Sequence, residues 1–484
     1  MPGTIASVNV TAAEKRREQR NALVASFLGW TLDAFDFFIV VMVLTEMSRD
    51  FKRSNAEMAF TLSVTLAFRP VGAFIFGLLA DRYGRRIPLM IDVAFYSCIE
   101  IASGLAPNYT TFLVLRALFG IGMGGEWGVG ASLAMEAVPP RWRGVLSGVL
   151  QEGYAIGYLL ASLAYLFVFP LLGWRAMFFI GGAPAILAWF IRRKVKESEV
   201  WAKARHKDWS ALWSAVRSHF PAYVILAAAA ALADLAISTL GIPLWPSNKG
   251  SETVLLRACI VFVAGTLTVF MADVTWRVAE GYRRLFFYLV ALMTMMNFVA
   301  HGTQDMFPTF LKNHRGFSPQ LTAIVTIIAN FGAIAGGICF GLLSDRLGRR
   351  RSIATALSLA ILIIPLWAYA PTVALLALGA FLMQFMVQGA WGVIPAHITE
   401  LSPDSVRGFF PGFAYQCGVL IAGSVAFLEA LFAERMNYAN AMAVTALTVF
   451  ILCIITVMLG REKKGIEFGG QSGVGHKDPD PSLL

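Results

Sequence analysis

Charged residues are scarce in this chain. Of its 484 residues, 14% are Asp, Glu, Lys or Arg and 57% are hydrophobic, and the mean hydropathy is +0.65. Soluble domains usually carry about 25% charged residues. The deficit argues against a soluble domain and, together with 43 Gly and 37 Phe, favours a protein embedded in a membrane.

Residue patterns typical of enzymes and metal sites are also missing. The chain has six His and five Cys, with no CxxC pair and neither an HExxH nor a GxSxG motif. All the cysteines lie in apolar segments, which is typical of small hydrophobic side chains rather than of disulfides or metal ligands. They are Cys98, Cys259, Cys339, Cys417 and Cys453. We therefore predict no enzyme activity, no cofactor and no metal site.

The net charge of +10 comes from short Lys and Arg clusters between apolar runs. The positive-inside rule produces this pattern, so we expect a lipid bilayer as partner rather than nucleic acid. No obligatory protein partner is evident. A cluster from Lys15 to Arg20 precedes the first apolar run, and no cleavable signal peptide is visible, so we expect a cytoplasmic N-terminus.

Long apolar runs fill most of the chain, and a helix needs about 20 apolar residues to cross a bilayer. Fourteen candidate spans lie near 22–45, 57–80, 87–105, 110–135, 144–170, 176–192, 222–243, 254–273, 284–311, 320–343, 351–370, 374–397, 407–432 and 438–460. The predicted fold class is therefore an all-α membrane protein.

A ten-residue segment occurs twice, 264 positions apart (341 − 77). Residues 77–86 read GLLADRYGRR and residues 341–350 read GLLSDRLGRR. Three further matches share this offset: Trp127-Gly128 with Trp391-Gly392, Glu136 with Glu400, and Arg143-Gly144 with Arg407-Gly408. Several blocks in one register indicate two homologous halves of six spans each.

The repeat leaves two extra spans in the middle of the chain. We predict a cytoplasmic tail at 1–21, a six-helix bundle at 22–192, a cytoplasmic linker at 193–221, two extra transmembrane helices at 222–275, a second six-helix bundle at 276–460 and a cytoplasmic tail at 461–484. An even number of extra helices gives both halves the same orientation, so both copies of the repeated segment are expected in the cytoplasm.

Arg69 is the first candidate for a functional group inside the membrane, where a charge at the bilayer centre costs at least about 2.5–3.5 kcal/mol. It precedes Gly77 on the same expected helix, about 12 Å from the cytoplasmic end at 1.5 Å per residue. A guanidinium suits a bidentate contact with a substrate carboxylate. The alternative is a structural ion pair with Asp33, Asp36 or Glu126.

The span near 284–311 carries a second polar group. Asn297, His301 and Asp305 follow one another at intervals of four and share one helix face, and Thr309 extends the stripe. A His beside an Asp can hold or release a proton near neutral pH. The alternative is a polar seam between helices.

Asp33 and Asp36 lie on the corresponding span of the first half, where the offset places Asp33 opposite Asn297. Transporters built from repeats bind their substrates at such a repeat interface. The two carboxylates are therefore candidates for proton coupling or, equally, structural partners of Arg69. Lesser polar candidates are Glu152, Asn330, Gln384, Gln388 and Gln416, whereas His397 and Glu400 are expected near a span end.

The repeated segments are predicted to act as gating loops, because Asp81 and Asp345 can cap helix N-termini and pair with arginines when the cytoplasmic side is closed. The gating residues are Gly77, Asp81, Arg82, Gly84, Arg85, Gly341, Asp345, Arg346, Gly348 and Arg349. The alternative is a charge cluster that only fixes topology.

The repeated Gly-x-Leu-x-Asp-Arg-x-Gly-Arg-Arg segment resembles the signature loop of the major facilitator superfamily. The layout of twelve spans plus two resembles the sialate:proton symporter branch, which also contains lactate permeases. This resemblance implies two six-helix bundles that alternate access to a central site.

Residues 297–309 resemble the Asn-x-x-Ser/Thr-His-x-Ser/Thr-Gln-Asp-x-x-x-Thr motif of yeast-type lactate and pyruvate permeases, with Ala300 in place of Ser or Thr. The resemblance implies that the motif residues and Arg69 bind substrate and proton. Those positions are Asn297, His301, Gln304, Asp305 and Thr309.

The expected function is proton-driven symport of a small monocarboxylate across the plasma membrane, or the inner membrane of a bacterium. The alternatives are a sialic acid:proton symporter or another organic-anion carrier. A nutrient sensor usually adds a long signalling tail, whereas residues 461–484 are short and polar.

Overall fold

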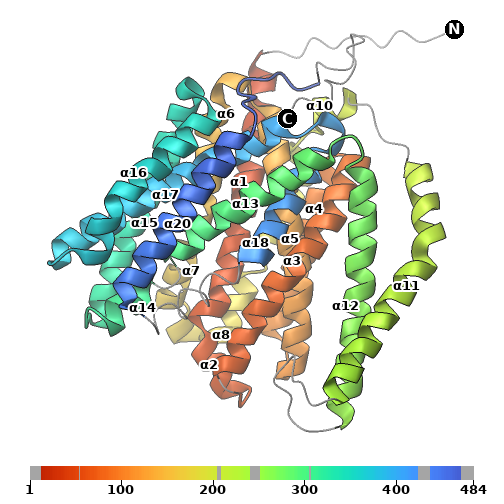
Figure 1. The fold of residues 1–484 in the computed structure, drawn as a ribbon, viewed down its shortest axis with the longest axis horizontal. Coiled ribbons are helices and arrows are strands. Elements are labelled where there is room, and N and C mark those ends of the chain that lie inside the picture. The colour runs from red at the N-terminus through yellow and green to blue at the C-terminus, as the bar shows by residue number, and fades with distance from the viewer. Residues whose placement is uncertain are drawn as a thin grey trace. The chain divides into compact units, whose positions relative to one another are not determined.

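The computed structural model describes residues 12–53, 55–203, 209–239, 251–304, 307–422 and 436–469. The regular elements in these ranges are all helices, which confirms the predicted fold class (Figure 1). Ten of the described helices are long and apolar enough to cross a membrane.

The first half of the repeat forms ten α-helices and one short 3₁₀ turn, η1 (Pro140–Trp142). The α-helices are α1 (Ala12–Met42), α2 (Leu44–Asp50), α3 (Asn55–Tyr83), α4 (Arg86–Gly104), α5 (Tyr109–Ala137), α6 (Arg143–Gln151), α7 (Gly153–Phe167), α8 (Phe169–Ile180), α9 (Pro184–Lys194) and α10 (Glu199–Lys203).

The second half has a matching series. It comprises α13 (Arg283–Gln304), α14 (Phe307–Asn313), α15 (Pro319–Leu347), α16 (Arg349–Tyr369), α17 (Val373–Leu401), η2 (Asp404–Val406), α18 (Phe410–Ala422) and α20 (Tyr438–Leu459). Part of the predicted span at 407–432 lies outside the described residues.

The chain divides into two compact units. The larger contains residues 1–205 and 287–476 and therefore both halves of the repeat. In the smaller, α11 (Trp209–Thr239) packs along α12 (Ser251–Val278), and the Tyr223 hydroxyl donates to Asp273 Oδ2 at 2.6 Å. Two further expected spans thus correspond to this helix pair, with α11 beginning inside the predicted linker.

Close backbone contacts repeat in the two halves. A Cβ on Gly72 in α3 would collide with the carbonyl oxygen of Ile121 in α5, and a Cβ on Gly336 in α15 would collide with that of Phe385 in α17. Small residues let membrane helices approach closely, and van der Waals packing holds them together there. Both pairs are related by the 264-residue offset (336 − 72 and 385 − 121), so the two halves share one packing design.

The halves contact each other through α6 and α18. Helix α6 of the first half packs against α15 and α17, and α18 of the second half packs against α3 and α5. These contacts concentrate near Asp81 and Asp345, and we call this the gate end of the larger unit.

Candidate functional site

A cavity of about 440 Å³ lies between the two halves of the larger unit. Its polar lining residues come from both halves. They are Arg69, Gln151, Glu152, Asn297, His301, Thr303, Gln304, Thr326, Asn330, Gln384 and Gln388. A site shared by two repeats can change its exposure when the repeats rock against each other.

Arg69 stands in the wall of this cavity with only 4% of its surface exposed. Its Nε and Nη2 atoms have no hydrogen-bond partner among the described residues. Its guanidinium carbon lies 5.8 Å from the ring centroid of Tyr415. Because an unsatisfied buried donor is costly, these two nitrogens indicate a missing acceptor.

The second half supplies an amide cluster to the wall of the same cavity. Gln304 Nε2 donates to Gln384 Oε1 at 2.7 Å, and Asn297 Nδ2 donates to the carbonyl oxygen of Met293 at 2.7 Å. His301 lies between Asn297 and Gln304 along α13 and also lines the cavity. Three residues that the sequence predicted for the site, Asn297, His301 and Gln304, therefore line the cavity.

The remaining predicted site residues lie elsewhere. Thr309 lies on α14 and is not among the lining residues, and Asp305 lies outside the described residues. Asp33 and Asp36 are fully buried inside the first half and do not line the cavity.

Aromatic rings form much of the remaining cavity wall, and sequence reasoning did not single them out. They include Trp30, Tyr154, Tyr158, Phe307, Trp367, Trp391 and Tyr415. Trp30 and Tyr154 stack with centroids 5.4 Å apart. Only Trp391 carried a signal in the sequence, because it belongs to a repeated Trp-Gly pair.

The predicted gating loops meet the opposite half in a reciprocal arrangement. Asp81 accepts hydrogen bonds from the backbone nitrogens of Gly408 at 2.7 Å and Phe409 at 3.1 Å, just before α18. Asp345 accepts from those of Gly144 at 2.9 Å and Val145 at 3.2 Å, at the start of α6. A carboxylate is stabilised at such helix N-termini.

Arginines complete this network in each half. Arg85 binds Asp81 at 2.7 Å and Glu136 at 3.1 Å. Arg349 binds Asp345 at 2.8 Å and Glu400 at 2.9 Å. Across the halves, Arg143 approaches Glu400 and Arg407 approaches Glu136, each at 3.7 Å. These ion pairs join the two halves at the gate end.

The other gating-loop residues hold the backbone or lie at the surface. Gly84 and Gly348 have φ values of 95° and 96°, which favour glycine. Gly77 packs against Phe409 and Gly341 packs against Gly144. Arg82 and Arg346 are exposed.

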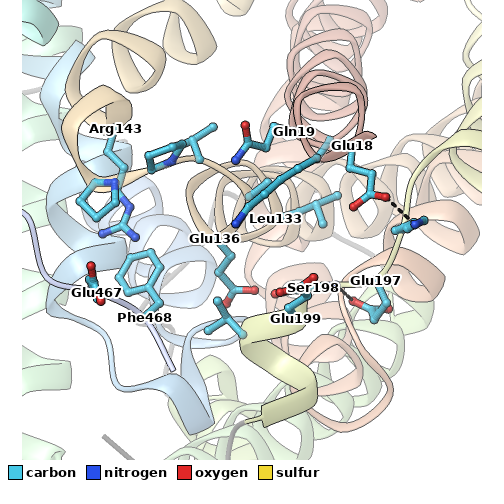
Figure 2. Close-up of a pocket in the computed structure, with 18 residues that line it drawn as sticks. Glu18, Gln19, Leu133, Glu136, Arg143, Glu197, Ser198, Glu199, Glu467 and Phe468 are labelled. Atoms are coloured by element: carbon cyan, nitrogen blue, oxygen red, sulfur yellow. Dashed lines mark hydrogen bonds and ion pairs between the residues drawn. The ribbon is translucent and has the colours of Figure 1, made fainter. Parts of the chain in front are cut away.

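Residues 461–469, which follow α20, also lie at the gate end. The Phe468 ring stacks on two guanidinium groups, with its centroid 3.5 Å from Cζ of Arg143 and 3.9 Å from Cζ of Arg407. Figure 2 shows Phe468 and Glu467 beside Arg143, at one side of a second cavity of about 350 Å³. One aromatic side chain thus bridges arginines from both halves.

Comparisons with known proteins find a matching family model and related transporters. The family model described as Major Facilitator Superfamily matches residues 22–305 and 287–477. A carboxylic acid transporter protein homolog from Saccharomyces cerevisiae is 27% identical over 459 residues, covering 92% of this chain and 68% of that protein. The sialic acid transporter NanX of Escherichia coli is 25% identical over 402 residues, covering 83% of this chain and 84% of that protein.

Among solved structures, the proton:xylose symporter XylE superposes with a TM-score of 0.68 at 17% identity. The match covers 94% of this chain and 98% of that one. At this identity the likeness concerns the fold.

Proposed function

We propose that this chain, which belongs to the major facilitator superfamily, carries a small monocarboxylate across the membrane together with a proton. The observation that supports this function most strongly is the pair of unpartnered Arg69 nitrogens in the wall of the central cavity. A carboxylate would satisfy both in one bidentate contact.

The cavity chemistry favours a single carboxylate. Arg69 is the one Arg or Lys among the described lining residues, so a second carboxylate on the substrate would have no such cation to bind. The amides of Asn297, Gln304 and Gln384 can bind a hydroxyl or a carbonyl group next to the acid. Lactate, pyruvate and related acids fit this description.

The main alternative is a sialic acid, which also bears one carboxylate and many hydroxyl groups. The relative NanX supports it, whereas the yeast relative supports a carboxylic acid. A cavity of about 440 Å³ lies within the range of typical small-molecule sites, so selectivity among acids depends on the amides and aromatic rings.

Alternating access would proceed through the gate end. In the structure the two loop carboxylates cap helices of the opposite half, and Phe468 bridges Arg143 and Arg407. Opening that end requires breaking these contacts together, as expected for a two-state element.

Proton coupling is assigned to Asp33, Asp36, His301 and Asp305, and no cofactor is required beyond the proton gradient. The proposed location is the plasma membrane, or the inner membrane of a bacterium. No obligatory protein partner is invoked.

The proposed topology places the gate end, both termini and the α12–α13 connection in the cytoplasm. We expect a cysteine at Glu280, in a variant without native cysteines, to resist an impermeant reagent added outside intact cells. A cysteine at position 248 is expected to react with it. The reverse pattern would contradict the layout of fourteen spans.

The transport proposal is tested by uptake of labelled lactate and labelled sialic acid into proteoliposomes, each with and without an imposed proton gradient. We expect one of the two acids to accumulate against its gradient only when the vesicle interior is alkaline. Uptake of neither acid, or uptake indifferent to the proton gradient, would contradict the proposal.

A further inference from the structure

A single carboxyl group lines the central cavity, and no step of the proposed function uses it. Glu152 and Arg69 are the only Asp, Glu, Lys or Arg residues among the described residues of the cavity wall. Each of them has 4% of its surface exposed. The wall therefore presents one buried guanidinium group and one buried carboxyl group.

The side chain of Glu152 lacks a partner in the same way as that of Arg69. Its Oε1 atom is buried and has no hydrogen-bond partner among the described residues. The atom reaches the second half of the repeat, where it occupies the space that a Cβ on Gly337 in α15 would fill. Because an unsatisfied buried acceptor is costly, this oxygen indicates a missing hydrogen-bond donor.

The backbone around Glu152 favours a negative charge. The residue lies where α6 ends and α7 begins, so that its backbone nitrogen donates to the carbonyl oxygen of Gly148 at 3.2 Å and its carbonyl oxygen accepts from the nitrogen of Ile156 at 3.1 Å. It is the N-cap residue of α7, but its side chain makes no capping hydrogen bond. A helix N-terminus stabilises a nearby carboxylate. The position therefore suits an ionised carboxylate with an oxygen left for a ligand.

The internal repeat relates the positions of Glu152 and Arg69. Arg69 lies where α3 meets α18, with its Cζ atom 5.8 Å from the ring centroid of Tyr415. Glu152 lies where α15 meets the junction of α6 and α7. The offset of 264 residues pairs Arg69 with Ala333 in α15 (333 − 69) and Glu152 with Gln416 in α18 (416 − 152). The two charged groups thus belong to equivalent contacts between the halves, and each contact contributes one of them to the wall.

The rest of the cavity suits a carbon skeleton that joins two polar ends. A cavity of about 440 Å³ lies in the range of sites that enclose drug-sized ligands, so it has room for an acid considerably larger than lactate. The stacked rings of Trp30 and Tyr154 form part of its wall. Aromatic faces bind apolar groups and attract cations.

We propose that Glu152 is a second substrate-binding residue, which accepts a hydrogen bond from a hydroxyl or protonated amino group at the end of the acid remote from its carboxylate. This inference rests on the proposed function and narrows its substrate class. The acid has one carboxylate for Arg69, one donor for Glu152 and a carbon skeleton that contacts the aromatic rings. An acid without the donor leaves the Glu152 oxygen buried and unpaired.

The test is calorimetric titration of the purified protein with hexanoate and with two derivatives that carry a hydroxyl or an amino group on the terminal carbon. The three acids have the same flexible chain and differ only in the terminal group. Because a hydrogen bond to a charged group is stronger than one between neutral groups, we expect at least one derivative to bind about 10- to 150-fold more tightly than hexanoate. The comparison of the two derivatives shows whether the donor is neutral or cationic.

Glu152→Met removes both carboxyl oxygens and keeps a side chain of similar length. In this variant we expect the preference for the derivatives to disappear, while the affinity for hexanoate changes little. Glu57→Gln, an exposed partner of Arg53, is the control and should retain the native preference. Should Glu152→Met fail to fold, Glu152→Gln must reduce the preference instead. Glutamine suits this packing, since the second half carries the buried Gln416 at the equivalent position.

The outcomes separate this inference from the proposed function. If the native protein binds none of these acids and neither lactate nor sialic acid, the proposed function fails. Equal affinity for the three acids, or binding of lactate without binding of either derivative, overturns the inference and leaves the proposed function standing. If sialic acid alone binds, Glu152→Met must weaken its binding, and an unchanged affinity overturns the inference. A variant that loses affinity for hexanoate and both derivatives by the same factor would assign Glu152 to packing and also overturn it.

Discussion

Replacing Arg69 by Lys is expected to weaken binding of the substrate acid by about 10- to 150-fold, while the protein still inserts and folds. Lysine keeps the positive charge but loses the flat pair of donors, and a hydrogen bond to a charged group contributes roughly 1.5–3 kcal/mol. Binding affinity is measured by calorimetry on purified protein. Arg175→Lys, at an exposed ion pair with Asp50, is the matched control and should bind normally.

The same variant separates the two interpretations of Arg69. A structural ion-pair partner tolerates Lys at this position, since an ammonium group also pairs with a carboxylate. Unchanged affinity in Arg69→Lys would therefore assign Arg69 to the packing of the first half and remove it from the substrate site.

Replacing Gly128 by Ala is expected to prevent closure of the gate end and to reduce uptake at least about tenfold. A Cβ on Gly128 in α5 would collide with the backbone of Gly412 in α18. Overpacking of this kind costs typically 1–3 kcal/mol, and that cost falls on the closed arrangement alone. The equilibrium shifts toward the state in which the gate end is open.

This shift is measured with a cysteine at Ser147, which is fully buried at the gate end and accepts a hydrogen bond from the backbone nitrogen of Ala396 at 3.0 Å. Faster labelling of Ser147→Cys in the Gly128→Ala background is the expected result. Gly265→Ala is the control, because a Cβ there makes an ordinary contact at 3.5 Å with Ala227. Unchanged labelling alongside normal uptake would show that this contact does not gate transport.

The fold could be predicted from the sequence because two independent features, the apolar runs and the internal repeat, indicated the same architecture. The apolar runs predicted the helices, and the shared offset predicted two homologous halves. In the structure, Gly72 and Gly336 make equivalent close contacts in the two halves. The capping role expected for Asp81 and Asp345 corresponds to the contacts found, but the sequence could not show that each caps a helix of the opposite half.

The position of Asp33 and Asp36 could not be predicted. From Ala22 onward, helix α1 is apolar on nearly every side. Its sequence therefore does not distinguish the face toward the cavity from the face toward its own bundle. In soluble proteins apolar residues point inward and polar residues outward, but no hydrophobic driving force sorts the helix faces in this way inside a membrane. The structure turns Trp30 and Phe37 to the cavity and buries both aspartates inside the first half.

The contact of Phe468 with Arg143 and Arg407 could not be predicted from the sequence either. It follows a short Lys- and Gly-containing segment with no helical period, and such a segment gives no indication of where it packs. Only the structure places its ring on Arg143 and Arg407.

Coupled movement of acid and proton is the central claim, and the pH inside reconstituted vesicles tests it most directly. Vesicles that contain a trapped pH indicator receive an inward gradient of the transported acid, with no proton gradient imposed. The account predicts acidification of the interior that far exceeds the passive rate seen with protein-free vesicles. Entry of labelled acid at the native rate without acidification beyond that background would contradict it.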